Sequence, residues 1–203
     1  MADQSRPYRM KRRAESQQRT RERITQSAVA LHGTLGPART TMSAVADHAG
    51  VRRSTLYRHF PDESALFEAC SAHWAAANPP PDLSAWASVA DPERRLGVAL
   101  LELYAYYGRT EKMLGNLLRD EAAVPVVAER FAAFHLWLTA ARDVLMAGRG
   151  LRAGARTRTQ AALGHAVAFP TWKSLVREQG LTDGAAARLI GALVTAAGAG
   201  PSD

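Results

Sequence analysis

Two short helices separated by a tight turn are predicted within residues 41–60, TMSAVADHAGVRRSTLYRHF. Thr40 or Thr41 is the expected N-cap of the first helix, and Gly50 can adopt the left-handed backbone that ends it. The second helix stops at Pro61, because proline cannot continue a helix. The stretch is therefore a helix, a glycine turn and a second helix in about 20 residues.

The second of these helices has an outward face made of hydrogen-bond donors. Its polar residues are Arg52, Arg53, Ser54, Thr55, Tyr57, Arg58 and His59. Such a face suits insertion into the major groove of DNA, where base edges offer acceptors to arginine and hydroxyl groups. An ordinary helical hairpin with a hydrated face has the same composition, so composition alone leaves both interpretations open.

The rest of the chain is expected to be helical as well. Apolar residues recur at helical spacing, whereas the alternating pattern of a β-strand is absent, so the fold class is all-α. A helix is predicted to start at Thr20. The segment before it contains Pro7 and carries no apolar stripe, and residues 1–15 are therefore interpreted as a flexible basic arm.

Proline and glycine mark the expected breaks further along the chain. Three consecutive prolines in the segment 78–82 form a linker, since such a run is stiff and cannot be helical. Residues 113–118 are assigned to a shorter helix, and the Gly/Arg-rich stretch 148–154 is assigned to a loop. Two final helices are expected at about 157–178 and 183–197.

Positive charge is concentrated in the first third of the chain. Residues 1–60 contain 12 lysine or arginine residues and 4 acidic ones, a balance of +8, whereas residues 61–203 carry a balance of −1. This distribution is typical of a protein that binds a polyanion, although a solvated basic tail would look the same. Most of the basic residues are arginine, which favours bidentate contacts with phosphates or bases.

Several classes of protein are disfavoured by what the sequence lacks. No apolar run approaches the roughly 18 residues of a membrane span, and no apolar segment follows the basic N-terminus as in a secretory signal. The single cysteine, Cys70, excludes a disulfide framework and fits the cytoplasm. The six histidines show no metal-ligand spacing, and no nucleophile stands in a catalytic motif. We therefore expect no metal, no cofactor and no enzymatic activity.

The segments TRERITQSAVALHGTLG (20–36), TTMSAVADHAGV (40–51) and STLYRHFPDESALFEA (54–69) resemble the N-terminal DNA-binding domain of the TetR family of transcriptional regulators. The Thr-Leu-Tyr-x-His-Phe core at 55–60 stands at the family's spacing, and so does the turn with Ala46, Gly50 and Val51. The remaining two thirds of the chain resembles the family only in length and helicity.

The resemblance implies an all-α, TetR-like fold of about nine helices, in which a three-helix helix-turn-helix domain precedes a helical ligand-binding and dimerisation domain. The expected parts are the arm 1–15, a DNA-binding domain at 16–77 with its motif at 41–60, and an effector-binding and dimerisation domain at 82–200. The implied function is that of a ligand-responsive regulator, most often a repressor. A small apolar effector would release it from a palindromic operator in double-stranded DNA, and a homodimer would form through the last two helices.

The resemblance also assigns roles within the helix-turn-helix motif. The residues expected at the DNA backbone are Thr41, Ser43, Arg52, Tyr57 and His59, with Ser43 near either a phosphate or a base edge. The residues expected to face the bases are Arg53, Ser54, Thr55 and Arg58. Glu63 departs from the family pattern, because many members carry a lysine there for a phosphate. That contact should be missing.

Aromatic residues on the inner faces of the C-terminal helices are either core residues or the lining of an effector pocket. The candidate ligand-binding residues are Tyr104, Tyr107, Leu117, Phe134, His135, Trp137, Phe169 and Trp172. The small residues of the last two helices either fill the domain's own core or pack against a second copy. The second interpretation is favoured because helix-turn-helix proteins normally bind two half-sites.

A function of another class stays open beside this one. The chain could be a helical enzyme or scaffold whose basic tail binds nucleic acid without sequence preference. A palindromic footprint on duplex DNA supports the regulator, and uniform binding at all sequences supports the alternative.

Overall fold

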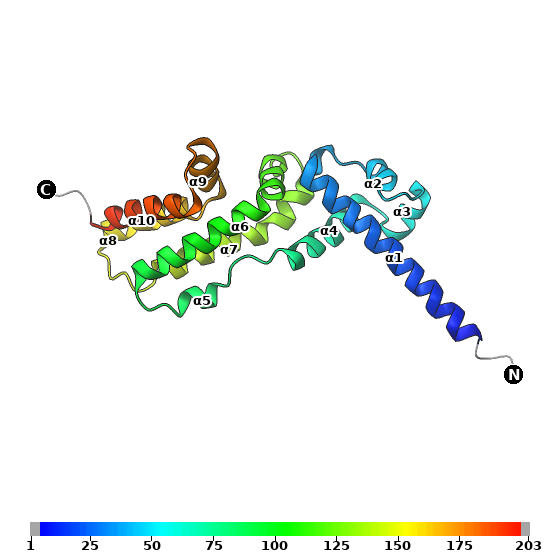
Figure 1. Ribbon diagram of the computed structural model, residues 1–203, viewed down its shortest axis with the longest axis horizontal. Coiled ribbons are helices and arrows are strands. Elements are labelled where there is room, and N and C mark those ends of the chain that lie inside the picture. Colours follow the sequence, from blue (N-terminus) through cyan, green and yellow to red (C-terminus); the bar gives the residue numbers. More distant parts are fainter. Residues whose placement is uncertain (1–4, 200–203) are drawn as a thin grey trace. The chain divides into compact units, whose positions relative to one another are not determined.

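The computed structural model describes the backbone of residues 5–199 and the side chains of residues 8–199 (Figure 1). The all-α class is confirmed, since these residues form ten α-helices, two shorter helical turns and no β-strand. No helix in this part of the chain is long and apolar enough to cross a lipid bilayer. The elements are α1 Ser5–Thr34, the 3-10 turn η1 Pro37–Arg39, α2 Met42–His48, α3 Arg53–His59, α4 Glu63–Ala77, α5 Leu83–Ala87, α6 Pro92–Asp120, α7 Pro125–Met146, α8 Ala153–Ala166, α9 Phe169–Lys173, the π-helical turn η2 Ser174–Glu178 and α10 Asp183–Ala199.

The helices group into two compact units. The first contains the chain up to Pro79 together with Gly115–Arg130, and the second contains Pro80–Leu114 together with the chain from Phe131 onward. The first unit is discontinuous because the end of α6 and the start of α7 pack with α1 to α4. The continuous domain expected at 82–200 includes this returning segment, which here belongs with the N-terminal helices.

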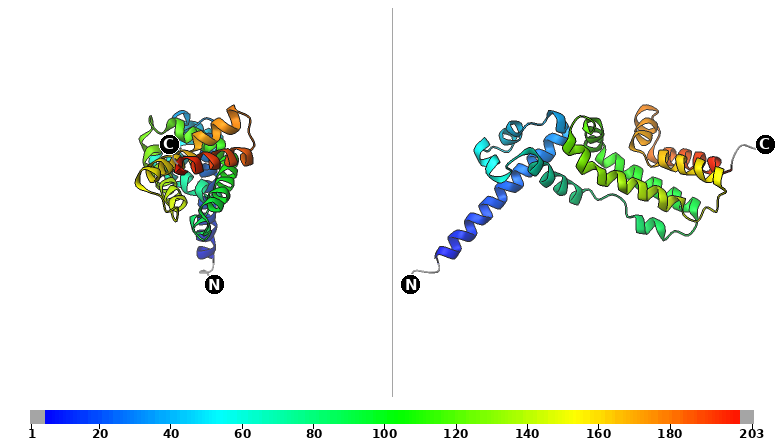
Figure 2. Two further views of the ribbon diagram at one scale, coloured as in Figure 1. Left: turned by 90° about the vertical axis from the view of Figure 1, so that its left-hand side faces the viewer. Right: turned by 180° about the vertical axis from the view of Figure 1, so that it is seen from behind.

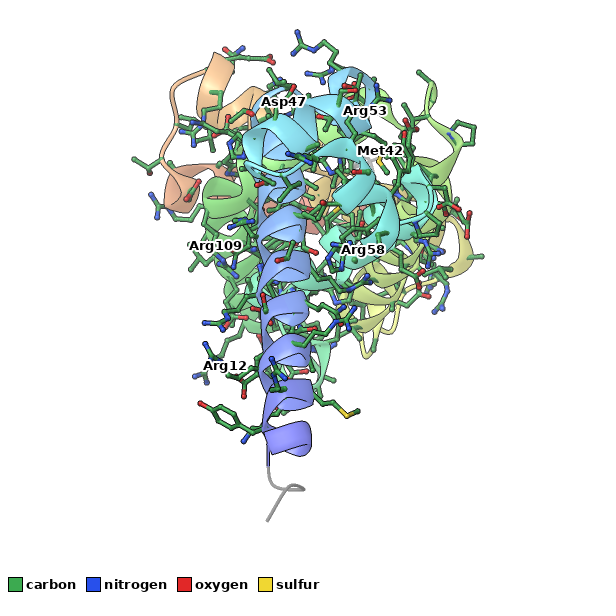
Figure 3. The ribbon with its side chains drawn as sticks, turned by 90° about the vertical axis from the view of Figure 1, so that its right-hand side faces the viewer. Arg12, Met42, Asp47, Arg53, Arg58 and Arg109 are labelled. Atoms are coloured by element: carbon green, nitrogen blue, oxygen red, sulfur yellow. The ribbon has the colours of Figure 1, made fainter. Side chains whose placement is uncertain are left out.

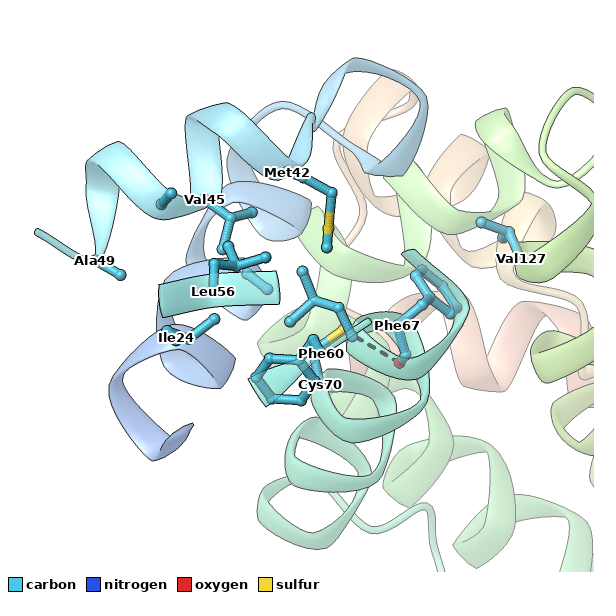
Figure 4. Packing of buried hydrophobic residues seen from close by; sticks show 12 residues of the cluster. Ile24, Met42, Val45, Ala49, Leu56, Phe60, Phe67, Cys70 and Val127 are labelled. Atoms are coloured by element: carbon cyan, nitrogen blue, oxygen red, sulfur yellow. Dashed lines mark hydrogen bonds between the residues drawn. The ribbon is translucent and has the colours of Figure 1, made fainter. Parts of the chain in front are cut away.

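The first unit has one hydrophobic core to which α1, α2, α3, α4 and α7 all contribute (Figure 4). Burying each large apolar side chain stabilises the fold by about 1.5–3 kcal/mol. Helices as short as α2 and α3 are marginal by themselves and depend on this burial. The buried members are Ile24, Ala28, Met42, Val45, Ala46, Ala49, Leu56, Phe60, Leu66, Phe67, Cys70 and Val127.

Helix α1 begins at Ser5 rather than at Thr20, so the expected flexible arm at 1–15 is helical from Ser5 onward. The residues of the arm before that point lie outside the described part of the chain. Pro7 stands in the first turn, where a helix needs no amide donor. The sequence pattern misses this extension because it has no apolar stripe, and every residue from Tyr8 to Arg19 is exposed.

The second unit is built on the N-terminal part of α6 and most of α7. Leu96, Leu100 and Leu103 of α6 are fully buried and stand on one face of the helix. Helix α6 continues to Asp120, so the separate short helix expected at 113–118 is wrong and is the last part of α6. Three glycines, Gly97, Gly108 and Gly115, lie within α6 without ending it, because an isolated glycine costs a helix only about 1 kcal/mol.

The single helix expected at 157–178 is also wrong, because the structure divides this region. Helix α8 begins at Ala153, inside the expected loop, and α9 and the π-helical turn η2 follow it as separate elements. Pro170 explains the break, since it has no amide donor and stands in the first turn of α9. Helix α10 begins at Asp183, as expected, and runs beside α8 in both Figure 1 and Figure 2.

Candidate DNA-binding site

Helix α2 starts at a threonine cap. The Thr41 hydroxyl accepts a hydrogen bond from the Ala44 amide at 3.1 Å, which satisfies one of the free donors of the first turn. Val45 fixes the other side of the helix in the core. The two residues expected at the DNA backbone therefore stand at the start of α2, Thr41 exposed and Ser43 half-buried.

A glycine makes the turn between α2 and α3 possible. Gly50 has a φ of 62°, in the left-handed region, and the Val51 amide donates to the Ala46 carbonyl at 3.0 Å. Arg52 is the N-cap residue of α3, but its side chain makes no capping hydrogen bond. The exposed Arg52 guanidinium is thus free of a local structural role.

Helix α3 buries one side and exposes the other. Leu56 is fully buried, whereas the next residue, Tyr57, is 41% exposed. Arg53 and Arg58 are both exposed, and Figure 3 shows Arg53 above Arg58 in that view. The predicted DNA-binding residues of this helix divide into exposed Arg53, Ser54, Tyr57 and Arg58 and half-buried Thr55 and His59.

The end of α3 is attached to α1 by an arginine that sequence reasoning does not single out. Arg21 Nη1 donates to the His59 carbonyl oxygen at 2.7 Å, and its guanidinium lies 4.1 Å from the centre of the Phe60 ring. A cation at a helix C-terminus complements the helix dipole, so Arg21 holds α3 in place. Its only signal in the sequence is a positive charge among many.

His59 is less accessible than Tyr57. Its Nε2 atom is buried and has no hydrogen-bond partner among the described residues. Desolvation lowers the pKa of His59, and the positive charges of Arg58 and Arg21 lower it further. The neutral ring is therefore favoured, and contact between Nε2 and a phosphate requires the side chain to move.

The last carbonyl groups of α1 are satisfied by two side chains from the end of α6. Asn116 Nδ2 donates to the carbonyl oxygens of His32 at 2.9 Å and Gly33 at 3.0 Å. Arg119 Nη2 donates to the Leu35 carbonyl oxygen at 3.0 Å. Carbonyls at a helix end have no partner within the helix, so these donors complete the C-terminus of α1.

Asp120 binds the connection between α1 and α2. Its Oδ2 accepts from the Ala38 amide at 3.0 Å, and its Oδ1 accepts from Arg119 Nε at 2.7 Å. The bond from Arg119 lowers the pKa of Asp120, so the carboxylate stays charged. Asn116, Arg119 and Asp120 form what we call the α6 clamp, which fixes the segment leading to Thr41. No local pattern in the sequence indicates it.

A histidine and a cysteine meet inside the first unit. Cys70 Sγ lies 3.4 Å from His32 Nδ1, and the His32 ring centre lies 5.3 Å from that of Phe67. Burial lowers the pKa of His32 to about 4, although the charge of Asp120 acts in the opposite direction. Burial also raises the pKa of the Cys70 thiol to about 12, so neither group is charged near neutral pH.

The His32 site predicts a loss of stability in acid. The unfolded chain protonates His32 with a pKa near 6.5, whereas the folded chain does so near 4. The unfolded state therefore binds more protons between these values. The stabilisation is complete above pH 6.5, and roughly 3 kcal/mol is lost as the pH falls towards 4. Urea unfolding across this range should show a shallower pH dependence for His32→Gln than for the wild type. Parallel curves would contradict the assignment.

Four of the residues expected to bind an effector form one buried aromatic cluster in the second unit. They are Tyr104, Tyr107, Phe169 and Trp172. Their polar groups bond within the unit: the Tyr104 and Tyr107 hydroxyls donate to main-chain carbonyls at 3.0 and 2.5 Å, and Trp172 Nε1 donates to a carboxylate at 2.9 Å. Burial raises the pKa of both tyrosines, so their hydroxyls remain donors.

The other expected ligand residues lie elsewhere. Phe134 and Trp137 of α7 stack with ring centres 5.9 Å apart, and Phe134 lies 6.5 Å from Tyr106, which connects them to the buried cluster. His135 is exposed and meets the edge of a neighbouring ring. Leu117 packs against the core of the first unit and so does not join the aromatic residues.

A polar hollow of about 400 Å³ lies in the second unit where α7 ends and α8 begins. Asp143, Arg149 and Arg156 are among its lining residues, and none of the residues expected to bind an effector is. Within the described part of the chain, no group of three or more His, Cys, Asp or Glu side chains is arranged to hold a metal ion.

Comparison with known proteins identifies the class of the N-terminal unit. Residues 24–70 match the family model of the bacterial regulatory proteins of the tetR family. A protein from Mesorhizobium loti assigned as a TetR-family transcriptional regulator shares the fold with a TM-score of 0.62 at 19% identity, over 90% of this chain and 96% of that one. A Clostridium perfringens protein assigned as a fatty acid metabolism regulator has a TM-score of 0.62 at 14% identity, over 85% and 96% of the two chains. No curated protein matches the sequence.

These matches confirm the resemblance drawn from the motif residues. The chain carries the TetR-family helix-turn-helix domain, and its fold is that of the TetR-family regulators. The match at residues 24–70 covers α2, α3 and most of α4, and it includes the core-facing part of α1.

Proposed function

We propose that this protein is a sequence-specific, ligand-responsive regulator of transcription, most simply a repressor, acting as a homodimer on double-stranded DNA in the cytoplasm. The observation that carries the proposal is the exposed donor face of α3, held by Leu56 in the core and by Arg21 at its end. The proposal makes the protein a binding module rather than an enzyme.

The proposed contacts with DNA are of two kinds. Arg53, Ser54, Thr55 and Arg58 read base edges in the major groove. Thr41, Ser43, Arg52, Tyr57 and His59 contact or approach the backbone, which sets the register without reading sequence. Glu63, exposed in the first turn of α4, complements the helix dipole but offers a phosphate no positive charge.

Base reading is tested by replacing the two arginines of α3. Arg53→Ala or Arg58→Ala should weaken binding to a duplex selected from a random pool by about 1–3 kcal/mol and relax the sequence preference. Tyr57→Phe is the matched control, because losing a phosphate contact should weaken binding to all sequences alike. Titrations on selected and scrambled duplexes distinguish the cases. An equal loss on both duplexes for the arginine variants would mean that they contact only phosphates.

The homodimer follows from the way a helix-turn-helix protein uses DNA. One α3 helix covers a single half-site, and two related by a twofold axis cover a palindrome. Helix α10 supports the proposed interface, because Leu189 and Leu193 are exposed on one side while Ile190 and Val194 are buried on the other. A second copy packed on α8 and α10 would cover the exposed pair.

The effector proposed for the second unit is small and apolar, with one or two hydrogen-bonding groups. Its pocket would open among the aromatic residues of α6, α7 and α9, whose polar atoms are now bonded to the protein itself. Because ligand and DNA would favour different conformations, each should weaken the affinity for the other by the same factor, typically 5–150-fold.

A thermal-shift screen of hydrophobic compounds against the full chain tests this effector. We expect binders that also release the selected duplex, and we expect Phe134→Ala to reduce both effects together. Leu136→Ala is the matched control on the same helix, since Leu136 is 71% exposed. Binders that stabilise the protein without changing its affinity for DNA would contradict regulation by this ligand.

A further inference from the structure

The exposed N-terminal part of α1 has no role in the core of the first unit. All residues from Tyr8 to Arg19 are exposed, whereas burial begins with Ile24 four residues after Thr20. Arg21 is already bound to the end of α3, so the preceding turns project beyond that helix (Figure 1). At 1.5 Å per residue the projecting segment 8–19 is about 18 Å long.

The segment carries a strong excess of positive charge. Five of its side chains are positive, Glu15 alone is negative, and there is no acidic residue in the first turn of α1. No basic side chain of the segment forms an ion pair within the described residues; Arg12 lies over the Tyr8 ring at 5.9 Å. The positive residues are Arg9, Lys11, Arg12, Arg13 and Arg19.

All four arginines of the segment share one face of the helix. Arg9, Arg12, Arg13 and Arg19 fall within about a third of the circumference at 100° per residue, and exposed Arg23 continues the same face. A row of arginines that form no ion pair with the described residues matches the regular negative charge of a phosphate backbone.

We propose that residues 8–19 form a helical arm that contacts the phosphate backbone of duplex DNA outside the half-site covered by α3. This inference rests on the proposed function, because it takes DNA as the partner of the first unit. An 18 Å arm spans about five base pairs, so the footprint of each subunit extends by about that length. The arm adds affinity without adding sequence preference, because it contacts phosphates only.

The test varies the length of DNA beside the selected site. The wild type should bind a duplex with flanks of about 10 base pairs about tenfold more tightly than one with flanks of about 2 base pairs. A triple variant, Arg9→Gln with Arg12→Gln and Arg13→Gln, should bind both duplexes equally. On the longer duplex it should lower the slope of log K against log salt by about 2–3. Glutamine preserves the helix, since its propensity is close to that of arginine.

The matched control removes the same charge from the second unit. Arg94→Gln with Arg152→Gln and Arg156→Gln changes three exposed arginines and should behave as the wild type does. A flank dependence and salt slope retained in the arm variant would overturn the proposal. If no preferred sequence can be selected, the proposed function fails, and the salt slope on a random duplex of about 40 base pairs still decides the arm. An equal slope for arm variant and control then overturns it as well.

Discussion

Replacing Leu193 with arginine is expected to give monomers and to weaken operator binding at least about 100-fold. Leu193 is 56% exposed on α10, on the side of the helix away from its own core. In the proposed dimer the substitution buries two unpaired guanidinium groups near the twofold axis, and burial costs several kcal/mol for each. A monomer covers only one half-site. Light scattering measures the assembly, and titration of a selected duplex measures the affinity.

The control for this variant is the same substitution at another exposed leucine. Leu136 of α7 is 71% exposed and lies outside the proposed interface, so Leu136→Arg should leave both the dimer and its DNA affinity unchanged. Circular dichroism establishes that both variants fold. A folded dimer from Leu193→Arg together with a monomer from Leu136→Arg would place the interface on α7.

Replacing Gly36 with alanine is expected to lower the free energy of unfolding by about 3 kcal/mol or more. Gly36 has φ 90° and ψ 157°, a backbone conformation that is essentially restricted to glycine. A methyl group at this position would also collide with the guanidinium of Arg119 and the carboxylate of Asp120. The substitution therefore strains the backbone and displaces the α6 clamp. Urea unfolding measures the loss.

Gly50→Ala measures the cost of backbone strain alone, without a collision with the α6 clamp. Gly50 also has a positive φ, 62°, but no atom lies within 4 Å of an added methyl group. Its replacement should cost only about 1–2 kcal/mol, the penalty of the left-handed region alone. Gly36→Ala should also weaken DNA binding, because the α6 clamp orients the start of α2. The apparent affinity for DNA should fall in proportion to the fraction of protein that remains folded. Equal losses of stability for the two variants would show that the side chains of the α6 clamp can move aside without an energetic cost.

The helix-turn-helix motif could be predicted because its signals are local. Thr41 and Asp62 cap their helices through hydrogen bonds at 3.1 and 2.8 Å, and Gly50 adopts the left-handed turn conformation. Each cap, and the glycine turn, depends only on residues close to it in the sequence. The exposed face of α3 likewise follows from helical spacing once Leu56 is placed in the core.

The α6 clamp could not be predicted because its partners are far apart in the sequence. Asn116 reaches a carbonyl 84 residues away, and Asp120 reaches an amide 82 residues away. Helical periodicity reports which face of a helix is buried, but not which other helix covers it. The same limit explains the wrong placement of Leu117. We expected it among the ligand-binding residues of the C-terminal domain, but it packs in the first unit.

The errors in helix boundaries have physical causes of a different kind. The N-terminal turns of α1 carry no apolar stripe because nothing in the unit packs on them. In the region 157–178 the apolar pattern continues across Pro170, although the missing amide of this residue allows a new helix to begin there. Pattern reasoning follows apolar residues, and it fails where a helix is solvated on all sides or where one helix follows another directly.

Selection of bound duplexes from a random pool tests the central claim most directly. The full-length protein is mixed with random duplex DNA, and bound molecules are recovered, amplified and sequenced over several rounds. The proposed regulator should enrich an inverted repeat whose half-site centres lie one helical turn, about 10–10.5 base pairs, or a multiple of it apart. Recovery of sequences with no shared motif, bound with equal affinity, would contradict sequence-specific recognition by α3.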